Sequence, residues 1–270
     1  MRVPAIILGI WAIMALGGNL GSLEPNRVAL EAIFKPPSAT HWLGADGLGR
    51  PVFDRLLAGA RVSLLVAVVS VTLSATIGIA VGLIAGYFGG LADRLISRLI
   101  EVFLAFPGML LAIAMAAMIG PGLDHVIIAL SAMGWVGYAR LVRIQVMALR
   151  QRDHVLAATA LGRTAPAIMR QHLLPLVMAP VWVEASFGLA GAVVAEAGLS
   201  FLGLGIQPPD ASWGSMIRDG VRYLLVAPHL VLAPGVALFL VVLSVNLLGD
   251  GLRDRLDVKT RRGIAPVSYT

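Results

Sequence analysis

The stretch that decides the fold is residues 150–175, RQRDHVLAATALGRTAPAIMRQHLLP. It is too polar to cross a bilayer, yet apolar runs of about 20 residues, enough to span one, lie on both sides of it. Residues 153–161 are good helix formers, and Gly162 predicts a helix end because glycine readily adopts the left-handed conformation. Thr164 and Pro166 suit the start of a second short helix. The sequence therefore predicts a helix–turn–helix outside the membrane, with exposed small residues at Ala157, Ala158 and Ala160.

The apolar runs extend along the whole chain. Its 270 residues are 58% hydrophobic and only 13% charged, whereas an ordinary soluble domain is about 25% charged. The first run resembles a signal peptide in its flanks, but its length favours an uncleaved span. We therefore expect an all-α polytopic membrane protein with six transmembrane helices, over residues 3–23, 62–88, 95–119, 126–149, 176–205 and 230–248.

Charge indicates how the chain sits in the membrane. Of the 21 Lys and Arg residues, 14 fall on the side that would hold both termini and residues 150–175. Basic residues gather on the cytoplasmic side of membrane proteins, so both termini are predicted to be cytoplasmic. The net charge of +6 then reflects topology and lipid contact, and we expect no nucleic-acid partner. The absence of cysteine excludes disulfides and thiol chemistry.

The polar stretch also resembles a known signature, the EAA motif of ABC importer permeases, in which this loop carries the coupling helix that docks on the ATPase subunit. Leu156 stands where the motif usually has Glu, and Asp153 keeps an acidic residue one turn earlier. The resemblance therefore assigns a coupling loop at about 150–175, with the residues Asp153, Leu156, Ala157, Ala158, Gly162, Leu174 and Pro175.

Three further segments, residues 41–64, 195–220 and 234–257, resemble motifs of C-type permeases in the dipeptide/oligopeptide/nickel subfamily. The resemblance covers about residues 40–257 and implies the type I ABC importer permease fold. It divides the chain into a first helix and external loop (1–60), a transmembrane type-1 domain (61–250) and a cytoplasmic tail (251–270). It also implies a location in the cytoplasmic, or inner, membrane of a bacterium or archaeon.

The function implied is that of a permease subunit in an ATP-driven importer of di- or oligopeptides. The implied partners are a B-type permease, two ATPase subunits and a periplasmic or lipid-anchored solute-binding protein. The chain has no Gly-x-x-x-x-Gly-Lys-Ser/Thr, so ATP and Mg²⁺ would bind the ATPase subunits and this chain would hold no cofactor, metal or catalytic residue. Import of nickel or another small solute is the alternative within the subfamily. An ion channel, a secondary transporter or an intramembrane enzyme is a more distant alternative.

Carboxylates in apolar runs usually face protein or water, because they cost at least about 2–3 kcal/mol at the bilayer centre. Glu101, Glu184 and Glu196 therefore line a translocation path or gate, or else form packing hydrogen bonds. Pro107 predicts a kink in the third span that serves gating or packing. For the outer loops we expect docking of the binding protein at Trp42, Asp46 and Trp213, with interfacial anchoring as the alternative for the two tryptophans.

Overall fold

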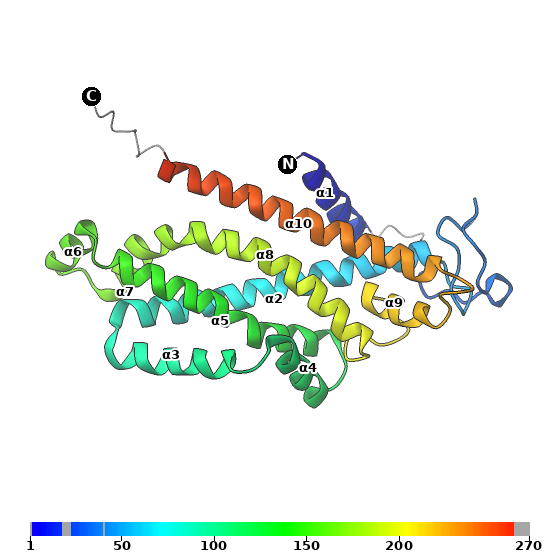
Figure 1. Ribbon diagram of the computed structural model, residues 1–270, viewed down its shortest axis with the longest axis horizontal. Helices are drawn as coiled ribbons and strands as arrows, with labels where there is room; N and C mark the ends of the chain where they lie inside the picture. Colours follow the sequence, from blue (N-terminus) through cyan, green and yellow to red (C-terminus); the bar gives the residue numbers. More distant parts are fainter. Residues whose placement is uncertain (1, 18–22, 40, 262–270) are drawn as a thin grey trace, which may run out of the picture.

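The structure is a computed structural model that describes residues 2–17, 23–39 and 41–261, with side chains up to residue 256. It is an elongated bundle in which the longest helices run side by side (Figure 1). The described residues form helices and loops, with a single antiparallel bridge between Ala45 and Pro51. The helices are α1 (Arg2–Gly17), η1 (Leu30–Ala32), α2 (Val52–Phe88), α3 (Gly90–Leu104), α4 (Gly108–Ile119), α5 (Leu123–Leu149), α6 (Asp153–Ala160), α7 (Ala165–Ile168), η2 (Met169–Leu173), α8 (Leu174–Phe201), α9 (Trp213–Val221) and α10 (His229–Arg261).

Four helical segments of the described chain are long and apolar enough to cross a membrane: α2, α5, the run from α7 to α8, and α10. Helices α3 and α4 satisfy the same test only together, and they are bent by 85° at the break between them. The predicted span at 95–119 is therefore broken next to Pro107, which confirms the predicted kink. The predicted first span contains α1, an apolar helix of 16 residues, and residues 18–22, which lie outside the described residues.

Helices α2 and α5 pack closely along their length. A Cβ atom at Gly82 would lie 2.7 Å from the carbonyl oxygen of Ala139 and 2.8 Å from the Cβ of Val142. Gly78 and Gly86, one turn to either side, approach α5 as closely. Small residues allow this approach in lipid, where dispersion contacts replace the hydrophobic effect as the source of helix association.

The two ends of the bundle carry different elements (Figure 1). Helices α6 and α7 form one end, whereas α9 and the loop segments 24–39 and 41–51 form the other. Helix α10 runs from the α9 end back toward the α6 end. Residues 150–175 therefore lie at the end opposite to the two loops predicted to be external, as the count of spans requires.

Two expected boundaries differ from the structure. Helix α2 begins at Val52, so the expected division after residue 60 falls inside a helix, and the division after residue 250 falls inside α10. The apolar runs begin or end there, but the charged residues beyond them continue the same helices. A helix ends where its backbone conformation changes, and leaving the bilayer does not require such a change.

Candidate functional site

The loop between α5 and α8 folds into the predicted helix–turn–helix. Helix α6 ends at Ala160, and Gly162 has φ +76°, in the left-handed region that favours glycine. The amide of Arg163 donates to the carbonyl of Ala158, which closes the turn. Thr164 occupies the N-cap position of α7 as predicted, although its side chain makes no capping hydrogen bond.

The two faces of α6 differ in what they contact. Val155 and Ala158 face inward and pack with Ile168, Leu173 and Val177 in one apolar cluster. The prediction that Ala158 is exposed is therefore wrong, because the chain folds α6 back onto its own α7–α8 segment. Ala157 and Ala160 are exposed, together with Leu156 at 52% and Leu161 at 85%. The outer surface of α6 is an exposed apolar patch at the very end of the molecule, of the kind that marks a protein contact.

Helix α6 is joined firmly to the span that follows. Helix α7 continues through the π-helical turn η2 into α8, which begins with Leu174 and Pro175. The rings of His154 on α6 and His172 on η2 lie 6.4 Å apart, and Arg163 donates a hydrogen bond to Gln171. These contacts hold α6 and the turn after it against η2, the segment that leads into α8.

The end of α5 is fastened to the neighbouring helices. The guanidinium of Arg150 donates to the carbonyls of Gly86 and Tyr87, at 3.3 and 3.1 Å, where α2 ends. Two turns earlier on the same side, Arg143 forms a two-pronged ion pair with Asp93 of α3, one contact measuring 3.0 Å. Both arginines were predicted only as topology signals, and their partners come from helices distant in the sequence.

A cavity of about 460 Å³ lies among α2, the α3–α4 break, α5 and α8. Its wall is largely apolar and includes Phe103, Phe106 and Met109 from the break. Gly108, which follows Pro107, also lines it, so the break shapes the cavity. The polar side chains in the wall are those of Ser70, Ser74, Tyr138 and Glu184.

The three intramembrane carboxylates lie in different surroundings. Glu184 is exposed and lines the cavity, as the path interpretation predicts. Glu196 is 1% exposed and accepts hydrogen bonds from Ser63 at 3.1 Å and Ser200 at 2.7 Å, as the packing interpretation predicts. Glu101 pairs with Arg98 at 3.0 Å on an exposed face of α3, outside the cavity wall.

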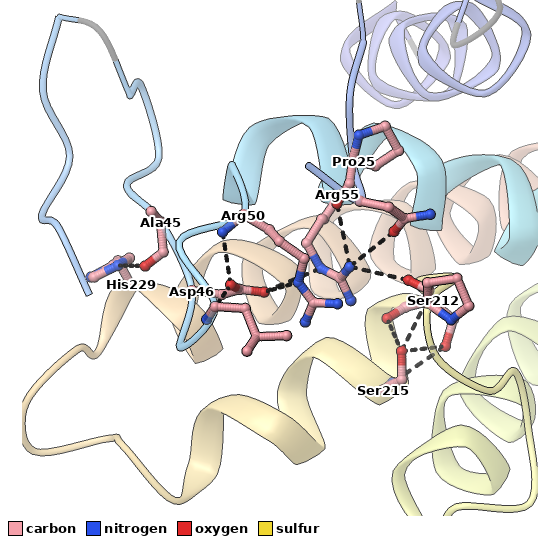
Figure 2. Close-up of polar contacts among 11 residues, drawn as sticks. Pro25, Ala45, Asp46, Arg50, Arg55, Ser212, Ser215 and His229 are labelled. Carbon is pink, nitrogen blue, oxygen red and sulfur yellow. Dashed lines mark hydrogen bonds and ion pairs between the residues drawn. The ribbon is translucent and has the colours of Figure 1, made fainter. Parts of the chain in front are cut away.

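At the opposite end, Asp46 organises the outer loop (Figure 2). Its carboxylate accepts from the backbone amides of Leu48 and Arg50, both at 2.9 Å, and from the Arg50 guanidinium at 2.7 Å. Arg55, which is 4% exposed, lies 3.6 Å from the same carboxylate and donates to the carbonyls of Pro25 and Pro209. Arg55 therefore joins three segments, a role that the sequence pattern does not reveal.

The two tryptophans predicted to dock a partner differ in their exposure to solvent. Trp42 is 68% exposed and packs against Phe53 with the rings tilted by 58° and their centroids 5.3 Å apart. Trp213 is 1% exposed, donates to the carbonyl of Leu56 at 3.0 Å and packs near Trp11. Trp213 is therefore too buried to dock a partner or to anchor the chain at the membrane interface. It is buried because α9 folds inward against α2 and α8.

Within the described residues, His, Asp and Glu side chains form no group of three or more that could hold a metal ion. The polar side chains described above instead form contacts between helices, hold the outer loop or line the cavity.

Comparison with known proteins gives these features a context. Residues 78–262 match the family model of the binding-protein-dependent transport system inner membrane component. The chain is 42% identical to the dipeptide transport system permease protein DppC of Alkalihalophilus pseudofirmus, over 95% of this chain and 83% of that one. It is 44% identical to the glutathione transport system permease protein GsiD of Salmonella paratyphi A, over 87% and 78% of the two chains.

Among solved structures, an inward-facing form of the MetNI methionine ABC transporter shares the fold. The TM-score is 0.60 at 22% identity, over 76% of this chain and 97% of that one. The helical bundle thus has the type I permease fold, and the chain is a transport subunit and not an enzyme. From the family match and these two relatives, the chain belongs to the family of binding-protein-dependent transport system inner membrane components, as an ABC importer permease.

Proposed function

We propose that this permease moves peptides through a path that includes the cavity between α2, α5 and α8, and that ATP hydrolysis drives it through α6. The observation that carries the proposal is the exposed apolar surface of α6, which is joined through η2 to a helix of the cavity wall. The printed names of the relatives, a dipeptide permease and a glutathione permease, support a peptide as the solute.

The partners belong to the same proposal. A second permease of the B type completes the path, and two ATPase subunits bind ATP and Mg²⁺ and receive α6. The coupling residues are Asp153, Leu156, Ala157 and Gly162 at the exposed side of α6 and its turn, Ala158 on the inner face, and Leu174 and Pro175 at the start of α8. The lack of a P-loop in the sequence supports separate ATPase subunits.

In the proposed orientation, α6 and both termini are cytoplasmic, and the loop of residues 24–51 and α9 face outward. The excess of Lys and Arg at the α6 end supports it. A solute-binding protein then docks on the outer end, where Trp42 is exposed and Asp46 holds the loop in shape. Glu184 and the break at Pro107 serve the path and its gating, whereas Glu101 and Glu196 lie outside the cavity wall.

The mechanism that this arrangement supports is alternating access. Closure of the ATPase pair displaces α6, and α6 carries α8 with it because the inner face of α6 packs on the α7–α8 segment that follows the turn at Gly162. The cavity wall on α8 then moves relative to α5, whose end is held to α2 by Arg150. Switching between two packed arrangements in this way transmits a motion without a soft linker.

The proposal is tested by reconstituting the complete transporter in proteoliposomes and measuring uptake of a radiolabelled dipeptide with and without ATP. We expect uptake only with ATP, the binding protein and active ATPase subunits. Uptake that persists after the ATPase subunits are inactivated would indicate a channel or a secondary transporter. Uptake of nickel without uptake of any peptide would favour the alternative solute.

A further inference from the structure

Glu184 is the one charged side chain among the described residues that line the cavity. No Lys, Arg or His in the described part of the wall balances it, and none of the ion pairs in that part of the chain includes it. The rest of the wall is apolar or carries hydroxyl groups. An unbalanced carboxylate attracts cations and repels anions, and both effects strengthen when a solute beside the apolar wall excludes water from it.

Glycines bring this carboxylate close to a tyrosine hydroxyl. A Cβ atom at Gly137 of α5 would lie 3.4 Å from the Glu184 carboxylate, and one at Gly188 of α8 would lie 2.6 Å from the Tyr138 hydroxyl. Glu184 and Gly188 are four residues apart and so share a face of α8. The carboxylate and the hydroxyl therefore lie one helical turn apart on a single wall between α5 and α8.

The same wall holds hydroxyl groups that lack partners. Tyr138 is 4% exposed and Ser70 is 2% exposed, and neither hydroxyl has a hydrogen-bond partner within the described chain. Buried polar groups in proteins are nearly always satisfied, because leaving one unpaired costs about 1–3 kcal/mol. These hydroxyls supply further hydrogen-bonding capacity in the wall that carries Glu184.

We propose that Glu184, with Tyr138 and Ser70, forms a recognition site for a cationic side chain of a peptide. The inference rests on the proposed importer function and narrows its solute class. The site favours peptides with a cationic side chain over neutral ones, and disfavours acidic peptides. The ion pair favours the cationic peptide, and charge repulsion acts against the acidic one.

The experiment uses the complete transporter in proteoliposomes, with the binding protein saturated by alanyl-lysine or by alanyl-glutamine. The measured quantity is the ratio of ATP-dependent uptake rates for the two peptides, which differ in one side chain. In Glu184→Gln we expect this ratio to fall by about tenfold, the effect of one charge-assisted hydrogen bond. Glu184→Lys should reverse the preference, so that alanyl-glutamine is taken up faster than alanyl-lysine. Glu101→Gln, which removes a carboxylate outside the cavity, should leave the ratio unchanged.

An unchanged ratio in both Glu184 variants would overturn the recognition site while leaving the importer function intact. The absence of ATP-dependent uptake of any peptide by the unaltered transporter would instead overturn the importer function, and the recognition site with it. Glu184→Asp keeps the charge and separates a loss of charge from a loss of folding. Restoration of the unaltered ratio by this variant supports the site, whereas an Asp variant that behaves like Gln contradicts it.

Discussion

At the scale of single residues, a buried carboxylate in this chain serves packing when hydroxyl groups surround it. Glu196 accepts from Ser63 of α2 and Ser200 of α8, and so joins two spans at a site that is 1% exposed. The sequence shows a Glu in an apolar run, but the hydroxyl from α2 comes from 133 positions away. A pattern along one helix therefore cannot separate this Glu from Glu184.

Removing this carboxylate should destabilise the permease. In Glu196→Ala both serine hydroxyls lose their acceptor, which costs about 1–3 kcal/mol for each group left unsatisfied. We expect the apparent Tm of the detergent-solubilised protein to fall by at least about 2–4 °C. Thermal unfolding followed by light scattering measures this shift, and Glu101→Ala on the exposed face of α3 is the matched control. Equal stability of the two variants would contradict a packing role for Glu196.

A second prediction concerns the glycine contact between α2 and α5. The side chain of Gly82→Val has no room beside Ala139 and Val142, so overpacking should cost about 1–3 kcal/mol. We expect a lower Tm and a lower yield of folded protein by size-exclusion chromatography. Gly235→Ala is the control, because a Cβ atom there meets nothing within 4 Å. A folded yield for the valine variant equal to that of the control would show that α2 and α5 tolerate separation.

At the scale of elements, α6 shows what a sequence can predict and what it cannot. Gly162 and the helix formers before it predict where α6 ends, because these are local backbone preferences. Which face of α6 is buried depends on its packing against Ile168 and Leu173, which local preferences do not determine. The break at Pro107 is likewise predicted, but its 85° angle depends on how α3 and α4 pack against the rest of the bundle.

The two faces of α6 give a prediction that separates coupling from folding. Ala157→Arg changes the exposed face, so we expect a stable permease whose ATP-dependent uptake falls at least about tenfold through lost docking. Ala158→Arg places an unpaired charge on the 7% exposed inner face, so this variant should lose stability as well. Uptake assays and Tm measurements on both variants decide the matter. Full uptake by the Ala157 variant would remove α6 from the coupling mechanism.

At the scale of the whole molecule, the order of spans was predictable and the outer end was not. The apolar runs determine how often the chain crosses, since about 20 apolar residues are needed for each crossing. Trp213 and Arg55 instead make contacts between loops that are far apart in sequence, and no periodicity reports such contacts. Of the six expected spans, the described chain shows four as long apolar helices and a fifth as the bent pair α3–α4, whereas α1 is a shorter apolar helix. Apolar content did not predict the contacts of the folded outer loops.

The arrangement of the two ends predicts opposite labelling of single cysteines. The chain has no cysteine, so Leu161→Cys and Leu225→Cys introduce unique thiols at positions 85% and 99% exposed. In intact spheroplasts, a membrane-impermeant maleimide should label position 225 and should reach position 161 only after the membrane is opened. Gel shift of the labelled protein measures this. Labelling of both positions from outside would contradict the proposed topology.

The hydrogen bonds that hold the outer end together determine which of its positions can be substituted. Arg55 and Trp213 donate to main-chain carbonyls of Pro25, Pro209 and Leu56, and every amino acid supplies such an acceptor. Substitutions at the accepting positions therefore keep the bonds as long as the backbone keeps its path, whereas the two donors have no substitute of equal reach. The shape of this end therefore depends on a small set of side chains, Arg55, Trp213 and the Asp46–Arg50 pair, and tolerates substitution at the positions that contribute only a carbonyl.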